Sequence, residues 1–209
     1  MNSIQSLEWR YACKKFDITK KLNNSQLATI KNAFNLTATS FGLQPLKLLV
    51  IKDQKLKDSL APHAYFQPQI STCSHLLVLC IETNIDEKTV DSYFDLVHKV
   101  RKTPEEILLK FRNDLKEIYK NNTAQENEQS AIYQTYIILG TLMMVCALEK
   151  IDSCPMEGFN AKKFDEILEL EKKGLKSVLL LPVGFRAEDD FMSKQKKVRK
   201  TLEELIIEI

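Results

Sequence analysis

A run of seven residues, 75–81, constrains the fold most, because every residue after its first histidine is apolar. A strand covered on both faces has this pattern, whereas a strand with one wet face alternates apolar and polar residues. Residues 46–51 and 176–185 also have strand composition, and Pro182 stands late in the second, where an edge or a bend tolerates a proline. Residues 205–209 have strand composition too, and they need a pairing partner to avoid aggregation.

Helical patterns are more numerous than strand patterns and do not alternate with them one for one. Ser3 is a candidate N-cap for a helix to about residue 14, and a second helix is expected from residue 23, with Leu27 and Ile30 at helical spacing. Shorter helices are expected at 54–60, 67–74 and 159–170, with a loop at 37–45. We therefore expect an α+β fold rather than a doubly wound one.

Residues 86–121 are rich in charge and have helical spacing, which predicts a helical excursion from the core. A break near Arg101 divides it, because Thr103, Pro104 and the acids after them form a helix start signal. Phe111 and Tyr119 are either aromatic residues of a lid or packing residues of these helices, and packing is the favoured interpretation.

Another apolar run, 131–148, is about as long as a membrane span. It contains Gln134 and Gly140, however, and tyrosines lie at one end. A buried helix of a soluble protein, over about 126–150, is therefore the favoured interpretation.

Composition and spacing argue against several classes of function. The 30 Lys and Arg are nearly balanced by 28 Asp and Glu, so the net charge of +2 gives no reason to expect nucleic acid. The five cysteines, none spaced as CxxC, are expected to be reduced thiols in a cytoplasmic protein. The three histidines lack zinc-ligand spacing, the start resembles no signal peptide, and no glycine-rich nucleotide loop occurs. We expect no metal, membrane or nucleic-acid partner.

Two basic clusters stand at opposite ends of the chain. Arg10 and Lys14 are four residues apart and would share one face of a helix. The second cluster is Lys194, Lys196, Lys197, Arg199 and Lys200. Each cluster alone is best interpreted as a solvated face; together, we expect them to converge on the phosphate of a flavin.

Residues 155–158 form a Pro-x-Glu-Gly turn in which a glycine allows close approach of a planar ligand. Taken alone, a tight turn before a helix is the favoured interpretation. The pattern nevertheless joins a longer series of motifs along the chain. These are Arg10-x-x-x-Lys14-x-Phe16-Asp17, Thr39-Ser40-x-x-x-Gln44-Pro45, Gln67-Pro68-Gln69 leading to Ser74-His75, Gln134, Pro155-x-Glu157-Gly158-Phe159, Pro182-Val183-Gly184 and Lys197-x-Arg199.

In this order and over nearly the full length, these motifs resemble the FMN-dependent nitroreductase family, in its NAD(P)H nitroreductase and dihydropteridine reductase branch. The resemblance implies one domain, 1–209, folded as a three-layer α-β-α sandwich with a mainly antiparallel central sheet. It implies an intertwined homodimer that exchanges a C-terminal strand. It also implies that NAD(P)H gives hydride to flavin N5 in a ping-pong cycle, with a nitroaromatic, quinone or pteridine-like acceptor.

The resemblance further implies the cofactor-binding residues, which are Arg10, Tyr11, Ala12, Lys14, Thr39, Ser40, Gly42, Gln69, Gln134, Pro155, Met156, Glu157, Gly158, Lys197 and Arg199. Arg10, Lys197 and Arg199 would hold the phosphate, whereas Lys14 and Gln69 would contact the ring or ribityl oxygens. Residues 155–158 would line one ring face, with a backbone N–H of the turn donating to N5. Thr39, Ser40, Gly42 and Gln134 would come from the second subunit. No side chain acts as a catalytic acid or base, and Lys14 and Glu157 tune the flavin.

The chain departs from the resemblance at Ala12, where serine is common, and at Gly42 and Phe66, where asparagine is common. Each departure removes a hydrogen bond to FMN worth ~1 kcal/mol, or about fivefold in affinity. Two alternatives remain: an FMN-binding sensor or flavin store with little turnover, and a non-flavin protein that binds an acidic partner.

Overall fold

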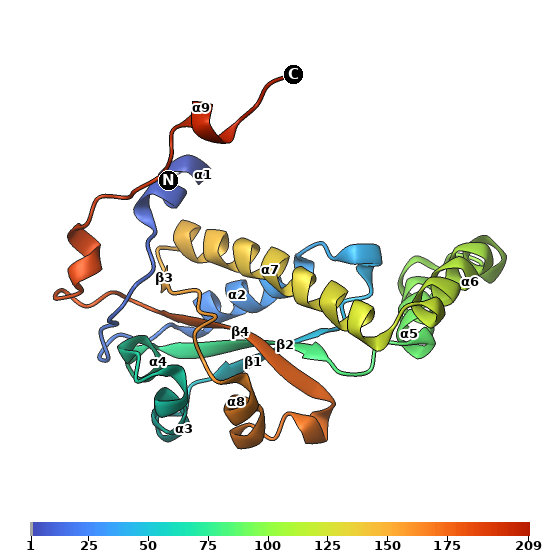
Figure 1. The fold of residues 1–209 in the computed structure, drawn as a ribbon, viewed down its shortest axis with the longest axis horizontal. Helices are drawn as coiled ribbons and strands as arrows, with labels where there is room; N and C mark the ends of the chain where they lie inside the picture. Colours follow the sequence, from blue (N-terminus) through green and yellow to red (C-terminus); the bar gives the residue numbers. More distant parts are fainter. Residues whose placement is uncertain (1) are drawn as a thin grey trace.

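The structure is a computed structural model that describes residues 2–209. Within this part, four strands form one antiparallel sheet in the order β1-β2-β4-β3, with helices on both faces (Figure 1). The strands are β1 (Leu46–Ile51), β2 (His75–Glu82), β3 (Asp152–Ser153) and β4 (Leu175–Gly184). The expected α+β sandwich of three layers is confirmed, and β3, which is too short to leave a pattern, was not expected.

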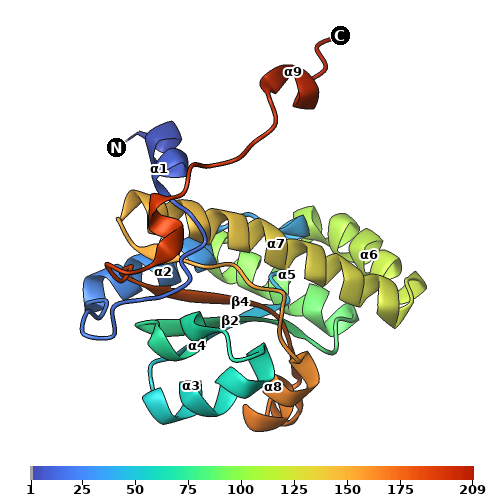
Figure 2. The same cartoon turned by 60° about the vertical axis from the view of Figure 1, so that its left-hand side comes forward.

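The helices lie on the two faces and at one end of the sheet (Figures 1 and 2). They are α1 (Ser3–Trp9), α2 (Asn24–Leu36), α3 (Gln54–Leu60), α4 (Pro68–Thr72), α5 (Glu87–Arg101), α6 (Glu105–Asn121), α7 (Ala124–Leu148), α8 (Ala161–Ile167) and α9 (Leu202–Leu205), with short 3-10 turns η1 (Ser40–Gly42), η2 (Ala61–Ala64), η3 (Glu171–Lys173) and η4 (Phe191–Lys194). The layer with α2 and α7 covers one face, and α3, α4 and α8 cover the other.

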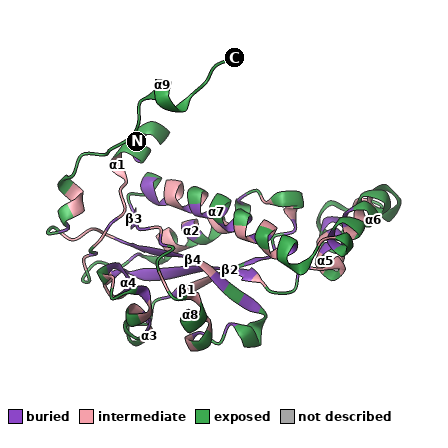
Figure 3. Ribbon diagram, in the orientation of Figure 1, coloured by how far each residue is buried: buried purple, intermediate pink, exposed green. Residues whose placement is uncertain are grey.

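The central strand β2 is covered on both faces, as its apolar run predicts (Figure 3). Leu77, Leu79 and Ile81 pack with α2 and α7, while the residues between them pack with α3, α4 and α8. Successive side chains of a strand point to opposite faces, so one strand contributes to two hydrophobic clusters.

Pro182 is not at a sheet edge, because β4 lies between β2 and β3. Its carbonyl accepts a hydrogen bond from Cys154 N at 3.1 Å, just past the end of the two-residue β3. The ring nitrogen faces the same side, toward residue 154 and away from β2, so the missing N–H takes no hydrogen bond from the pairing of β4 with β2.

The first helix ends earlier than expected. Asn2, not Ser3, caps α1 through a capping box with Gln5, and the helix stops at Trp9. Arg10 already has an extended conformation, with φ −73° and ψ 145°. The expectation that Arg10 and Lys14 share a helical face is therefore wrong.

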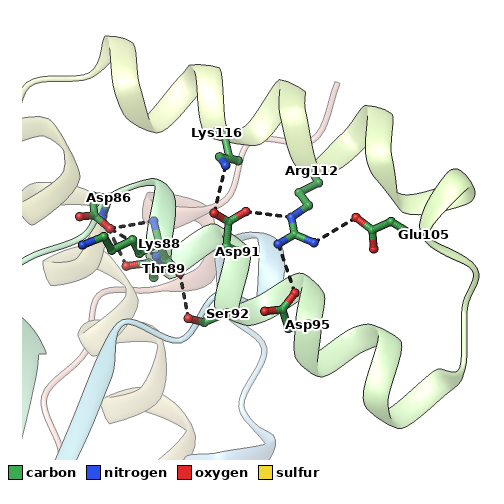
Figure 4. A network of polar contacts seen from close by, with 9 residues as sticks. All are labelled: Asp86, Lys88, Thr89, Asp91, Ser92, Asp95, Glu105, Arg112 and Lys116. Carbon is green, nitrogen blue, oxygen red and sulfur yellow. Dashed lines mark hydrogen bonds and ion pairs between the residues drawn. The ribbon is translucent and has the colours of Figure 1, made fainter.

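The two helices of the excursion form an arm beside the sheet, joined by ion pairs around Arg112 (Figure 4). Its guanidinium contacts Asp91 at 2.8 Å, Glu105 at 3.0 Å and Asp95 at 3.1 Å. Asp91 and Asp95 join α5 to α6, whereas Glu105 lies on α6 itself, so these ion pairs account for part of the charge-rich sequence of 86–121.

Within the arm, Pro104 rather than Thr103 occupies the cap position of α6, and no side chain caps it. Tyr119 is buried, as expected of a packing residue. Phe111 is half exposed and stacks edge-on against Phe94, with ring centroids 5.5 Å apart.

Among the described residues, α7 alone has the length and apolar composition of a membrane span. It lies on the sheet against α1 and α2, where Leu142 and Cys146 are fully buried. Its outer side exposes Tyr133, Tyr136 and Ile137. The helix is thus a core helix with one apolar side left uncovered in the single chain.

The last residues form no strand in the single chain. Leu205 ends α9, and residues 206–209 are exposed and project away from the body past α1 (Figure 2). An exchanged strand needs a second subunit to pair with, so the exchange stays a prediction.

Candidate functional site

The two ends of the chain meet beside α1 and enclose a cavity of about 510 Å³. Its lining comes from residues 8–12, from residues 192, 193 and 195–199, and from Pro155. Arg10, Tyr11, Ala12, Pro155, Lys197 and Arg199, all expected at one site, line this cavity. The structure therefore brings Arg10 of the first basic cluster together with part of the second, while Lys14, Lys194 and Lys200 do not line this cavity.

Four cations line this cavity: Lys196, and the three that are expected to hold a phosphate, Arg10, Lys197 and Arg199. Burial and the positive charge of Arg199 lower the pKa of Arg10, and burial, Arg10 and Arg199 lower the pKa of Lys197. Glu8 lines the same cavity, yet none of the three cations forms an ion pair with any residue of the described chain. Glu8 partly offsets these charges by raising the pKa of Lys197, but like charges held together without an ion-pair partner still favour binding of an anion.

Lys197 is partly engaged by the protein itself. Its Nζ donates to Leu7 O at 2.8 Å and to Arg10 O, both near the C-terminal end of α1. A cation suits the exposed carbonyls at a helix end. One of the three N–H donors of the ammonium is left for a ligand.

Lys14 and Gln69 also meet, although they come from different layers. Lys14 Nζ and Gln69 Nε2 each lie 3.9 Å from Cys154 Sγ. Gln69 Nε2 donates to Gln67 Oε1 at 3.0 Å, and Gln67 Nε2 donates to Gly158 O at 2.9 Å. This chain of contacts joins the start of α4 to the turn that follows β3; the contacts of Gln67 and Cys154 were not expected.

The turn at 155–158 is anchored at one side and open at the other. Met156 pairs with Leu180 of β4 through two backbone hydrogen bonds, of 2.9 and 3.0 Å. Glu157 accepts a hydrogen bond from Tyr136 of α7, with 2.6 Å between Oη and Oε1. In the described chain, the backbone N–H groups of Glu157 and Gly158 have no hydrogen-bond partner. They are available to a ligand.

A second group of expected residues lies elsewhere in the single chain. Thr39, Ser40 and Gly42 belong to the loop around η1, at the α5 end of α7, whereas residues 10–14 lie near its α1 end (Figures 1 and 2). Gly42 has φ +77°, and a Cβ there would lie 3.1 Å from the Tyr93 ring. An asparagine at this position would require Tyr93 to move.

Unsatisfied polar atoms coincide with the expected site. Among residues 2–209, four buried side-chain polar atoms lack a hydrogen-bond partner. Three are Arg10 Nε, Thr39 Oγ1 and Gln134 Oε1, and the fourth, Arg186 Nη2, still lies 2.6 Å from Asp152 Oδ1. A buried polar group without a partner costs about 1–3 kcal/mol, so these atoms indicate places where a ligand or partner binds.

Two arrangements that support the basic segment were not expected from sequence. The guanidinium of Arg186 lies over Trp9 at 4.4 Å and over Tyr11 at 4.5 Å from the ring centroids, and it pairs with the buried Asp152. Asp190 accepts hydrogen bonds from the same segment. In the sequence, the only sign of these two arrangements is that Asp152 stands near the Pro155 motif and Asp190 stands near the Lys197 motif.

Gly184 explains part of the Pro-Val-Gly motif. A Cβ at this position would lie 2.9 Å from the Phe16 ring and 3.1 Å from Ser74 N. The glycine thus lets the N-terminal segment lie flat against the ends of β2 and β4, which carries Phe16 and its neighbours to the site.

All five cysteines are buried, free thiols, as expected. Burial raises the pKa of Cys73, Cys80 and Cys146 to about 12. Burial also raises the pKa of Cys154, against the opposing charges of Lys14 and Arg10. No group of His, Cys, Asp or Glu within 2–209 is arranged to hold a metal ion.

Comparison with known proteins gives consistent results. Residues 7–185 match the model of the Nitroreductase family. A Staphylococcus haemolyticus protein, named as a "putative NAD(P)H nitroreductase", is 31% identical and covers 97% of this chain and 95% of its own. A Staphylococcus epidermidis protein named in the same way is 30% identical, with coverage of 97% and 94%.

Solved structures show the same fold. A nitroreductase structure from Bacillus subtilis has a TM-score of 0.87 at 18% identity, covering 99% of this chain and 98% of the other. A structure from Exiguobacterium sibiricum, solved in complex with FMN, has a TM-score of 0.86 at 21% identity, with coverage of 100% and 98%.

Proposed function

Because the chain belongs to the nitroreductase family, we propose that it is an FMN-dependent oxidoreductase with NAD(P)H as its reductant. The names of relatives about 30% identical and the FMN in a similar structure support this proposal. Bound FMN would supply the redox chemistry, passing hydride from NAD(P)H to a nitroaromatic, quinone or pteridine-like acceptor in a ping-pong cycle. The five buried free thiols favour a reducing compartment, and we propose the cytoplasm.

The meeting of Arg10, Lys197 and Arg199 carries this proposal. The three cations come from opposite ends of the chain, line one cavity and have no ion-pair partner among the described residues. A phosphate dianion suits them, because guanidinium groups donate in pairs to phosphate oxygens and a lysine adds a point charge. Arg10 Nε, which is buried without a partner, supplies one such donor. The residues present therefore fit the FMN phosphate.

The residues next to the cations fit the ring of a flavin. Lys14 would place a positive charge at the edge of the ring, where a reduced flavin carries negative charge. Gln69, which lies on α4, would donate a hydrogen bond to ring or ribityl oxygens. The free N–H groups of Glu157 and Gly158 would donate to a ring acceptor, while Pro155 and Met156 would cover one ring face.

A second copy of the chain would complete the site. Thr39 and Gln134 each have a buried polar atom without a partner, and Ser40 and Gly42 share the loop of Thr39. None of the four lines the cavity of the cations in the single chain. We propose a homodimer in which these residues reach the FMN bound by the other subunit.

The edge of β1 supports the exchange of the C-terminal segment. β1 has a free edge, and Lys47 is its only charged residue. A hollow of about 370 Å³ between β1 and α2 is lined by Lys31 and Lys47. Residues 202–209 combine exposed isoleucines and leucines with three glutamates, so their apolar side chains suit the apolar edge and their carboxylates suit Lys31, while Lys47 already pairs with Glu82.

The visible absorption spectrum of the purified protein, before and after anaerobic addition of NADPH, tests the proposal. We expect the two bands of an oxidised flavin and their bleaching on reduction. A flavin spectrum that NADPH and NADH leave unchanged would favour the sensor or flavin store. A colourless protein that takes up no added FMN would reject the flavin site altogether.

A further inference from the structure

One buried carboxylate joins the two segments that form the cation cavity. Asp190 is 2% exposed and lies 176 residues after Lys14 in the chain. Its Oδ2 accepts hydrogen bonds from Lys14 N at 2.9 Å and from Tyr11 Oη at 3.0 Å, with Lys15 N at 3.4 Å. Its Oδ1 accepts from Met192 N at 3.1 Å. The two oxygens therefore bind different segments.

The contacts of Asp190 extend a short backbone ladder between the chain ends. Asp17 N donates to Phe185 O at 2.8 Å, and Ala187 N donates to Lys15 O at 3.0 Å. Beyond Ala187 the two segments diverge, and the Asp190 carboxylate takes the place of a backbone acceptor. It reaches Lys14 N and Tyr11 Oη, which no carbonyl of the second segment reaches.

Asp190 also shapes the segment that follows it. Through Oδ1 it caps η4, and the chain then continues to Lys197 and Arg199. Lys197 returns to the N-terminal segment by donating to Leu7 O and Arg10 O. Residues 10–14 are thus held at one end by Lys197 and at the other by Asp190.

We propose that Asp190 is a positioning residue for the phosphate cations: it fixes the N-terminal segment against the C-terminal segment so that Arg10, Lys197 and Arg199 meet. This inference rests on the proposed FMN site, yet Asp190 itself touches no cation of the cluster through an ion pair in the described chain. It acts through contacts to backbone N–H groups, to the Tyr11 hydroxyl and to the Cys13 thiol.

Two effects of Asp190 on anion binding have opposite signs, and this makes the inference testable. Its negative charge, taken alone, weakens attraction of a phosphate to the cavity. Its positioning contacts strengthen phosphate binding by keeping the cations together. Replacement by asparagine removes the charge at nearly constant shape. Tighter FMN binding would therefore indicate a purely electrostatic role, and weaker binding a positioning role.

The experiment measures dissociation constants of FMN and riboflavin for the full-length protein and for Asp190→Asn, by quenching of flavin fluorescence. Riboflavin lacks the phosphate and reports on the ring site alone. We expect FMN binding to weaken about tenfold or more and riboflavin binding to weaken clearly less, because the segment that Asp190 holds also carries Lys14 of the ring site. Equal weakening for both ligands, unchanged FMN binding or tighter FMN binding would each overturn the inference.

Asp189→Asn is the matched control. It makes the same chemical change one residue away, where the carboxylate is exposed and pairs with Lys15 at the surface. We expect FMN and riboflavin dissociation constants within about twofold of wild type for this variant. If wild-type protein binds neither ligand, the proposed function fails, whereas a wild type that binds FMN tightly leaves the test of Asp190 intact.

Tyr11→Phe keeps the inference testable if Asp190→Asn does not fold. It removes one donor to Asp190 and keeps the ring that lies over Arg186. We expect an FMN-specific loss of about threefold to fivefold. In an Arg199→Ala background, Tyr11→Phe should reduce FMN affinity by a smaller factor. The N-terminal segment is positioned relative to Arg199, and that cation is absent in this background. A loss of the same size in both backgrounds would contradict positioning.

Discussion

The two halves of the candidate site differ in how they are built. The first half, around Arg10 and Lys197, is complete within one chain, because hydrogen bonds to Asp190 and to backbone carbonyls hold both chain ends. The second half, the loop of Thr39 and Gly42, rests on the arm through aromatic contacts such as Phe41 with Phe111 and leaves Thr39 Oγ1 without a partner. Under the proposed function, the single chain would thus hold the phosphate end of the site together, and a partner subunit would complete the other end.

This difference separates two kinds of disruption. Changes in the first half should weaken binding of the phosphate while the protein stays assembled. Changes that prevent association should remove the second half from every site at once, and their effect should be the larger one.

Ending the chain after Thr201 should have the largest effect. The change removes residues 202–209 and keeps Lys197 and Arg199, so the first half stays intact. We expect a monomer with roughly 100-fold weaker FMN binding, since several hydrogen bonds from the partner are lost together. Light scattering gives the mass and flavin fluorescence gives the affinity. A truncated chain that remains a dimer would contradict the exchange of this segment.

Arg199→Ala tests the first half alone. We expect about 30-fold weaker FMN binding, because a charge-assisted contact to the phosphate is lost, with the dimer unchanged. Lys15→Ala is the control, since Lys15 is exposed and pairs with Asp189 on the surface; its effect should be within about twofold. Equal dissociation constants for the two variants would argue strongly against the phosphate assignment.

The stability of the first half should depend on pH through Asp190. Burial opposes its charge, but hydrogen bonds led by Lys14 N hold its pKa below the ordinary value of 3.8. The stabilisation is therefore present above pH 3.8 and is lost as pH falls through the lower folded-state pKa. Wild type should exceed Asp190→Asn by about 2 kcal/mol in free energy of unfolding near neutral pH.

Urea unfolding at a series of pH values measures this difference. The difference in free energy of unfolding between wild type and Asp190→Asn should narrow as pH falls below about 3.8, because protonation then makes the Asp190 side chain neutral as well. A difference that stays constant into acid would show that the carboxylate charge is not what stabilises the junction.

Phe66→Asn should have the smallest effect and the opposite sign. Phe66 has φ +54° and follows Tyr65 at φ +55°, a left-handed conformation that asparagine adopts more readily than phenylalanine. We expect a gain of about 1 kcal/mol in stability and about fivefold tighter FMN binding from the new amide. Thermal unfolding and flavin titration measure the two gains.

Tyr65→Asn serves as the comparison for Phe66→Asn. It relieves the same backbone strain at the neighbouring, equally exposed position but places no amide at residue 66. We expect a gain in stability without a gain in FMN affinity. If both variants gain affinity equally, the effect comes from strain and not from a contact to the flavin.

Much of the fold follows from local patterns that the sequence displays directly. The apolar run of β2 predicts a strand covered on both faces, and helical spacing with caps predicts α2 and the break between α5 and α6. Motif order predicts that basic residues from both ends of the chain meet at one site. Such features depend on periodicity and on the chemistry of neighbouring residues, so they are present before the chain folds.

Tertiary structure alone decided where the first helix ends, that β4 lies inside the sheet, and that Asp190 joins the chain ends. Arg10 leaves the helical path although its spacing from Lys14 suits a helix, because the segment pairs instead with Ser153 and Arg186. The outcomes at the N-terminal segment depend on hydrogen bonds between residues more than 100 positions apart, such as Lys14 N with Asp190, and the place of β4 depends on its pairing with both β2 and β3. A local sequence pattern cannot indicate such a partner, because every residue except proline has the same backbone N–H donor. Only the folded structure determines which acceptor lies beside that donor.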